Sequence, residues 1–344
     1  MSYSPIDDSV STVSSSKILL LDSLRVHHTQ ALVNVVSSTL YPDLLDTRQL
    51  MKALFELRRH LESPLGYIQS HPATETNAAE VIEHILLYWV CAHAAQVDAQ
   101  NYNIKGVVET PDKRFDKYAH IPAEVISEAI QCISYLTTMS VGVAIVAKTS
   151  IPVSIVLLLN FTENYGTYTN AFRALTKLCT KHSVKRAQAD GRWESETGLY
   201  AILEAFTRAQ TAFRLRNRFD LVANAAYSVA SEMANSAGLS ISSSSSSDNG
   251  PAKYIGGSAA ERVVVSALLF VNALVDAHKD VEDRLRIRNE ILDTPLYQTM
   301  KLLEETEFDS SRAFTETRRF RRAYTDDIKA CDPHVQLLTA SQSA

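Results

Sequence analysis

Glycine and proline are scarce in this chain, with 10 of each among 344 residues. A protein built from many short strands needs both residue types at its tight turns, so their scarcity argues against an all-β fold. The four cysteines lie far apart and include no CxxC pair. This pattern favours buried thiols in a reducing compartment.

An excess of basic charge is also missing, since the formal net charge is -5 and charged residues make up 21% of the chain. The balance gives no bulk attraction to nucleic acid or to an anionic membrane, and we expect no nucleic-acid partner. No secretory signal is visible either, because residues 1–16 are polar and serine-rich, without an apolar core. We expect residues 1–16 to be disordered and the protein to be cytoplasmic.

No apolar run is long enough to cross a bilayer, which takes about 20 residues. The nearest candidate is MSVGVAIVAKTSIPVSIVLLLNF, residues 139–161, where Lys148 and Pro152 leave apolar runs of seven and nine residues. We interpret this stretch as two buried helices joined at Pro152.

Apolar residues instead recur at helical spacing along most of the chain. In LMKALFELRRHL, Leu50, Leu54 and Leu57 fall on one face of a helix. Ser258 and Glu261 have the spacing of a capping box ahead of the apolar run VVVSALLFVNALV. Nothing reads as a sheet, so the chain is predicted to be all-α.

The stretch RLRIRNEILD, residues 284–293, fits either a strand or a helix. Arginines alternate with apolar residues at the period of two of a half-buried strand. Arg286, however, is four residues from both Glu282 and Glu290, as in ion pairs on a helix face. An isolated strand among helices would leave its edges unpaired, so we expect a helix.

The spacing of similar helices suggests a repeat. Leu136 and Leu178 are 42 residues apart, within the period of about 40–47 residues of armadillo and HEAT repeats. Leu274 follows 96 residues after Leu178, close to two such steps or to one step plus an insertion. We predict an armadillo-like helical repeat solenoid, with a compact helical bundle as the alternative.

Residues 267–305 resemble the closing armadillo repeat of the diaphanous-related formins. The shared motifs are an I-N-A-L-like helix end, here VNAL, and R-x-x-x-R-N-E, here RLRIRNE. Upstream, NAFRALTKLC is similar to the family's A-x-x-L-L-x-x-L-C helix, and SYLTTMSVGVAIV to a repeat in which a helix breaks at a glycine, here Gly142. LRRHLESPLGY resembles the family's segment in which an L-R-containing helix meets a proline and an aromatic residue. The resemblance covers about residues 40–305.

The resemblance implies that the protein is regulatory rather than catalytic and that it needs no cofactor. In the family, the N-terminal part binds an activated Rho-family small GTPase, and the concave armadillo face holds an amphipathic autoregulatory helix from the formin C-terminus. The resemblance further implies that the protein is associated with the cytoskeleton and affects actin indirectly. The implied regions are a GTPase-binding-like part at 17–120, repeats at 121–310 with an insertion at about 211–257, and a tail at 311–344.

The resemblance also carries the candidate site residues. Those of the peptide groove are Thr138, Lys177, Thr180, Leu269 and Asn272. Lys177 stands where the family has a small residue, so we expect an acidic residue of the ligand to pair with it. Asn272 is expected to contact either a neighbouring helix or the ligand backbone.

The candidates for GTPase contact are Arg58, Glu62 and Ser63, the last two in place of an asparagine-rich loop of the family. In the closing repeat, the helix at residues 284–293 would be an outer one, with its arginines in solvent pairs. An armadillo-like scaffold that binds an unrelated peptide is the alternative function.

Two further clusters have simpler explanations. His84, Cys91 and His93 lie within ten residues, but without HExxH spacing or a second ligand cluster they indicate a structural role and no metal site. The segment Arg318–Arg322 holds four arginines beside aromatic residues, a pattern that can contact an anionic membrane or an acidic partner. Acidic residues flank it, and a solvated helix face is the competing interpretation.

Overall fold

The computed structural model describes most of the chain, namely residues 31, 33–36, 46–62, 72–96, 113–138, 140–180, 197–242, 258–305 and 312–331. Within these ranges the chain forms helices and turns without a strand, which confirms the all-α class. Residues 1–16, for which we predict disorder, lie outside these ranges, as do Ser63, the consecutive serines at residues 243–247 and the last residues of the tail. No helix in the described ranges is long and apolar enough to span a membrane.

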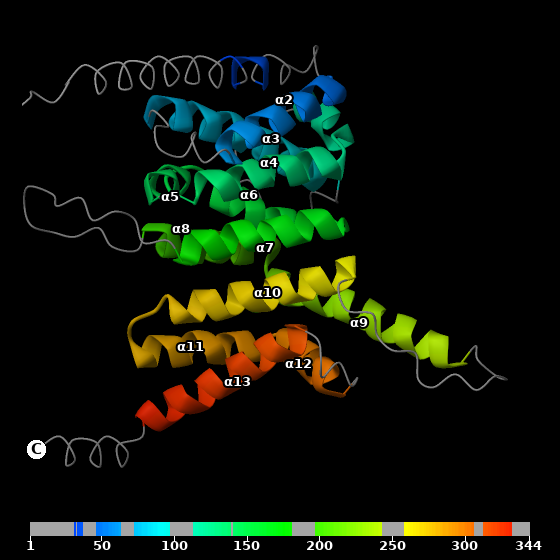
Figure 1. Ribbon diagram of the computed structural model, residues 1–344, viewed down its shortest axis with the longest axis vertical. Helices are drawn as coiled ribbons and strands as arrows, with labels where there is room; N and C mark the ends of the chain where they lie inside the picture. The colour runs from blue at the N-terminus through cyan, green and yellow to red at the C-terminus, as the bar shows by residue number, and fades with distance from the viewer. Residues whose placement is uncertain are drawn as a thin grey trace, which may run out of the picture.

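Five helices lie side by side and form one layer, which we call the front layer (Figure 1). In chain order they are α2 Thr47–Glu62, α4 Ala123–Leu136, α7 Tyr165–Thr180, α10 Ala259–Asp276 and α13 Arg312–Cys331. Each packs against the next, so residues far apart in sequence become neighbours on one face.

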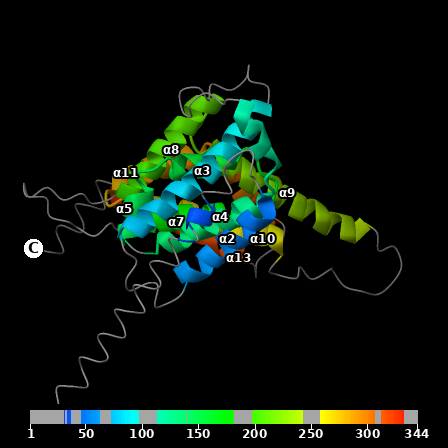
Figure 2. The same cartoon turned by 90° about the horizontal axis from the view of Figure 1, so that it is seen from above.

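A second set of helices packs behind the front layer, as the view from above shows (Figure 2). Its members are α3 Pro72–Gln96, α5 Ser140–Val146, α6 Ile151–Leu158 and α8 Thr197–Phe213, with the 3₁₀ helix η2 Lys113–His120 against α3. At the other end, α9 Asp220–Ser242, α11 Val281–Leu292 and α12 Leu296–Glu305 pack around α10 and α13. One continuous apolar core runs between these helices.

The apolar run at residues 139–161 contains α5 and α6, which confirms two helices, and the described side chains of α5 are buried or half-buried. All eight residues of α6 are buried. The break falls at residues 147–150, just before Pro152, which occupies the first turn of α6. Proline is tolerated there because the first turn leaves its backbone N–H groups without helical partners.

Gly142 lies inside α5, so the expected helix break at this glycine is wrong. The helix before it ends at Leu136, and the turn follows at Thr137 and Thr138. A Cβ atom at position 142 would lie 1.9 Å from the backbone carbonyl oxygen of Leu136. Glycine is needed here because α5 approaches the end of α4 too closely for any side chain.

The stretch RLRIRNEILD is helical, as expected, and forms most of α11. Its predicted ion pairs are wrong, because Arg286 pairs with Asp283 at 2.8 Å. The prediction that its arginines are in solvent is also wrong for Arg288, which is only 1% exposed and donates to Asp327 of α13. Arg288 can lie on the buried face of α11 because Asp327 of α13 supplies a carboxylate that neutralises it.

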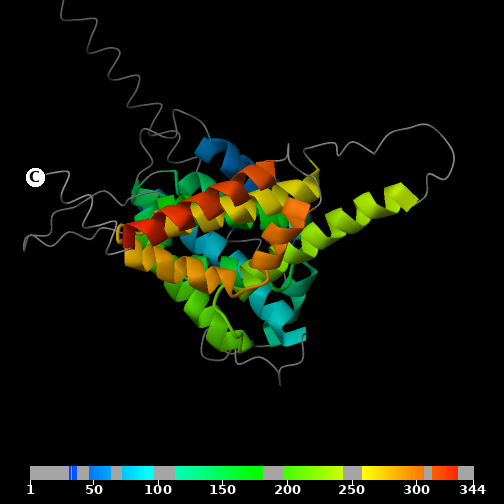
Figure 3. The same cartoon turned by 90° about the horizontal axis from the view of Figure 1, so that it is seen from below.

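Two segments that the resemblance places outside the repeats form helices that pack on the core. The predicted insertion contains α9, whose first half buries Val222 and Val229 while its second half projects from the body (Figure 3). The predicted tail contains α13, which lies across α10 and α11 and buries Phe320.

The Ser258 hydroxyl of the predicted capping box accepts from the backbone N–H of Glu261 at 3.0 Å.

Candidate functional site

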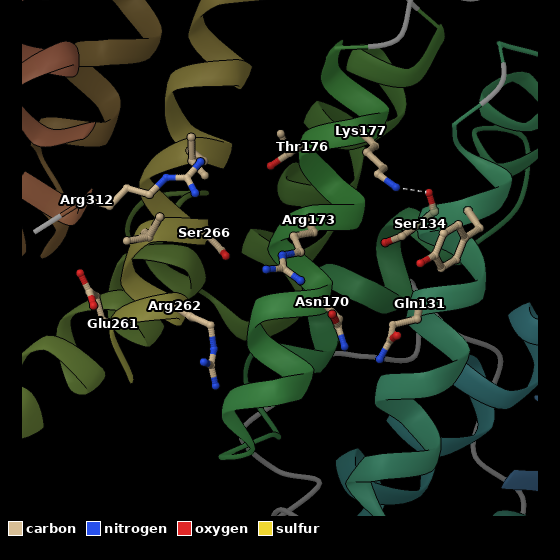
Figure 4. A pocket seen from close by; sticks show the side chains of 13 residues that line it. Gln131, Ser134, Asn170, Arg173, Thr176, Lys177, Glu261, Arg262, Ser266 and Arg312 are labelled. Atoms are coloured by element: carbon tan, nitrogen blue, oxygen red, sulfur yellow. Dashed lines mark hydrogen bonds between the residues drawn. The ribbon is translucent and has the colours of Figure 1, made fainter. Parts of the chain in front are cut away.

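A groove crosses the front layer where α4, α7 and α10 lie side by side, and α13 reaches its end (Figure 4). We call it the front groove. Its volume is about 620 Å³, within the range of roughly 300–1,000 Å³ typical of pockets that hold ligands. Its apolar lining comes from Val265 and Leu269 of α10.

Basic side chains dominate the charged part of the front groove. Arg173 and Lys177 come from α7, Arg262 from α10 and Arg312 from α13, whereas Glu261 is the one acidic residue in the described lining. The guanidinium groups of Arg173 and Arg262 lie in the space between α7 and α10 (Figure 4). Four cations against one carboxylate give the groove a positive potential.

Lys177 contacts the protein itself. Its Nζ donates to the backbone carbonyl oxygen of Ser134 at 2.6 Å and lies 5.3 Å from the centre of the Tyr135 ring. Ser134 is in the last turn of α4, where carbonyl groups lack helical partners and favour a nearby cation. Lys177 therefore joins α7 to the C-terminal end of α4, in addition to lining the groove.

The other groove candidates are divided between different places. Leu269 lines the front groove together with Lys177. Asn272 is buried, and its amide donates to the backbone oxygen of Glu316 at 3.2 Å and to Oε2 of the same residue at 3.0 Å. It therefore makes the helix–helix contact that was one of its two expected roles. Thr138 and Thr180 lie outside the groove lining, and each hydroxyl donates to a carbonyl of its own segment.

Two of the three GTPase-contact candidates, Arg58 and Glu62, belong to a polar cluster between α2 and α4. Arg58 pairs with the buried Glu128 and, at 3.3 Å, with Glu62. Glu62 also accepts from the Tyr135 hydroxyl at 3.1 Å. Because Tyr135 contacts Lys177 as well, one aromatic side chain links this cluster to the front groove.

Two of the four arginines in the α13 segment pair with carboxylates of the protein. Arg319 pairs with Asp276 at 2.8 Å, and Arg321 contacts Glu304 through two nitrogens at 2.5 and 2.9 Å. Arg318 lies over the Phe314 ring, 4.3 Å from its centre. Arg322 has no ion pair among the described residues. Contact of this segment with an anionic membrane or an acidic partner stays a prediction.

The histidines of α3 lie next to aromatic rings of the same helix. His84 lies 5.5 Å from Tyr88, and His93 lies 3.8 Å from Trp89 between ring centres. Burial raises the pKa of the Cys91 thiol to about 12, which keeps it protonated. No group of three or more potential metal ligands gathers anywhere in the described ranges.

Sequence reasoning missed Arg173, Arg262 and Arg312 as groove residues. No motif marks them, because each lies in a different helix and only the packing of α7, α10 and α13 brings them together. Alternation of exposed and buried positions along α7 could have indicated Arg173, which shares a helix face with Lys177 at a spacing of four. Compared with known proteins, the chain matches no protein-family model, and none of the curated proteins matches its sequence.

Proposed function

We propose that this chain is a regulatory binding domain whose front groove holds an amphipathic helix. The observation that carries the proposal is the meeting of Lys177 and Leu269 in one groove. The formin resemblance predicts both as groove residues, although they lie in different helices, α7 and α10. The proposal includes an armadillo-like solenoid, in which the front layer supplies the inner helices of successive repeats.

The groove has the chemistry that an amphipathic helix requires. Leu269 offers half-buried apolar surface, Val265 is buried next to it, and the surrounding side chains are polar or charged. Parallel inner helices of a solenoid form an extended surface on which a helix can lay its apolar face.

We further propose that α2 and the adjoining chain bind a Rho-family small GTPase, as in the formin region that the sequence resembles. The link through Tyr135 gives this binding a route to the groove. A partner that draws Glu62 away from the Tyr135 hydroxyl would release the side chain that Lys177 packs on. Binding at the two sites would then be coupled, and the coupling must act in both directions. Cytoskeletal location and indirect control of actin assembly follow from this proposal.

Titration calorimetry of the purified chain against the C-terminal helix of a formin from the same organism tests the proposal. Leu269→Asp should weaken binding by about tenfold or more, because a buried leucine contact contributes about 1.5–3 kcal/mol. Ile328→Asp is the matched control, since Ile328 is exposed on α13 outside the groove lining. Equal affinity of both variants would place the peptide elsewhere.

The scaffold alternative is favoured by one observation. Lys177 and Arg173 place two positive charges on the groove side of α7. The formin family has a small residue at the position of Lys177. A ligand with different charges could therefore replace the formin helix. Failure of the formin helix to bind, together with binding of an unrelated amphipathic helix, would favour this alternative.

A further inference from the structure

We infer that the front groove selects an acidic amphipathic helix, one that carries carboxylates on both sides of its apolar stripe. The inference rests on the proposed function, because it specifies the ligand of the same groove. It goes beyond that function by assigning the ligand's charge and the residues that read it, Arg173 and Arg262.

Charge imbalance in the lining is the first step of the argument. Arg173 and Arg312 are exposed and form no ion pair with any residue that the structure describes. Glu261 is buried at 5% exposure in the first turn of α10, so it offers little surface to a ligand. A ligand without acidic groups would leave the guanidinium groups of Arg173 and Arg312 partly desolvated and unpaired, which is unfavourable.

A comparison with other arginines of the same layers strengthens the inference. Arg58, Arg284 and Arg319 each meet a carboxylate from a different helix. Internal acids thus accompany the interhelical arginines between α2 and α4 and around α13. In the groove, Arg173 lacks such an acid among the described residues, although it lies between two packed helices. The carboxylate that completes this pattern would come from the ligand.

The position of the two arginines determines how the ligand would lie. Arg173 extends from α7 and Arg262 from α10 into the space between these helices (Figure 4). A helix seated over Val265 and Leu269 would present side chains to both walls of the groove. Because residues three or four apart share a helix face, the carboxylates that reach the two guanidinium groups would come from two such rows, one on each side of the apolar stripe. Arginine can bind a carboxylate through two parallel hydrogen bonds, which adds specificity.

Lys177 has a smaller part in this selection. Its ammonium already donates to the Ser134 carbonyl oxygen and packs on Tyr135. A ligand carboxylate would compete with these contacts or share the ammonium with them. Arg173 is therefore expected to contribute more to the preference for acidic ligands than Lys177 does.

Three designed peptides test the inference. Each is about 18 residues long, enough to form a helix, and carries the same leucine stripe. The flanking positions are all glutamate, all glutamine or all lysine. Fluorescence anisotropy measures their affinity for the full chain at about 50 mM and about 500 mM salt, since screening weakens exposed charge pairs.

We expect the glutamate peptide to bind about tenfold more tightly than the glutamine peptide at low salt, and the lysine peptide to bind most weakly. Arg173→Gln should reduce the glutamate preference by about threefold, and high salt should reduce it further. Arg216→Gln is the matched control, because Arg216 is exposed in the turn between α8 and α9 and changes the net charge equally. Circular dichroism checks that both variants keep their helices.

The outcomes separate the two proposals. Equal affinity of the three peptides, or a preference for lysine, would overturn the selection of acidic helices and leave the helix-binding groove in place. Equal effects of Arg173→Gln and Arg216→Gln would also overturn it, since the preference would then reflect net charge alone. Failure of all three peptides to bind would count against the helix-binding function itself.

Discussion

The arginines between α11 and α13 differ from those in the front groove in what they face. Arg284 and Arg288 converge on Asp327, with nitrogen–oxygen distances of 2.8 and 3.1 Å, and Arg288 also lies over the Phe320 ring. We call this set the α11–α13 ion cluster. Arg173 instead is exposed, lines the front groove and forms no ion pair among the described residues. The same residue type thus joins helices in one region and borders an unfilled groove in the other.

Whether an arginine has an internal carboxylate decides whether it contributes to stability or to ligand binding. A buried arginine whose carboxylate is removed becomes an uncompensated charge in the interior, at a cost of several kcal/mol. An exposed arginine without an internal partner contributes little to stability, so its charge is available to a ligand. Variants of the α11–α13 ion cluster should therefore reduce stability, whereas variants of the groove arginines should reduce peptide affinity.

The largest effect is expected at Asp327. Asp327→Asn would leave Arg284 and Arg288 without their shared carboxylate, and we expect a loss of about 3 kcal/mol in the free energy of unfolding. Asp276 lies 3.7 Å from Arg288 and offsets part of the loss. Urea denaturation followed by circular dichroism measures the change. A loss below about 1 kcal/mol would mean that the cluster behaves like a surface ion pair.

Acidification should weaken the same cluster. Burial by itself would raise the pKa of Asp327, but hydrogen bonds and charge from Arg284 and Arg288 outweigh burial and lower this pKa below its usual value of 3.8. The stabilisation is therefore complete above about pH 3.8 and is lost as the pH falls through the lower folded pKa. Thermal melts from pH 6 to about pH 2 should show a steeper decline for the wild type than for Asp327→Asn. Parallel declines would contradict the assignment.

A smaller effect is expected at the surface pair of α13 and α12. Arg321→Gln removes contacts to Glu304 that are partly exposed on both sides. We expect a loss of about 0.5 kcal/mol in the free energy of unfolding, partly recovered by salt. Urea denaturation at two salt concentrations provides the measurement. A loss as large as that of Asp327→Asn would erase the distinction between buried and exposed pairs.

The smallest effect on stability is expected in the front groove. Arg173→Gln removes a side chain that forms no described ion pair, so the free energy of unfolding should change by less than about 0.5 kcal/mol. The same variant should lower the affinity for an acidic helix. A marked destabilisation would show that Arg173 has a structural partner and would remove it from the ligand-reading residues.

The sequence predicted the helices well because their signals are local. Leu50, Leu54 and Leu57 are buried at the predicted face of α2, and the capping box at Ser258 forms the predicted hydrogen bond. The error at Gly142 arose because its role depends on the distance to Leu136, which no local pattern encodes. Arg288 was placed in solvent for a related reason, since its carboxylate lies 39 residues away on α13.

The groove could be predicted only in part. Lys177 and Leu269 were reached through family motifs, which carry positional information that periodicity lacks. Asn272 matched a motif as well, but it faces α13 and holds two helices together. Arg173, Arg262 and Arg312 became groove residues through the packing order of the front layer, which a single sequence does not specify.

Hydrogen exchange of the chain with and without the glutamate-flanked peptide tests the central claim most directly. Backbone amides along α4, α7 and α10 should gain protection when the peptide binds, because a helix seated in the front groove suppresses their local opening. Amides of the exposed face of α13 around Arg322 should remain unchanged. Protection confined to α13, or spread evenly over the molecule, would contradict a helix-binding site in the front groove.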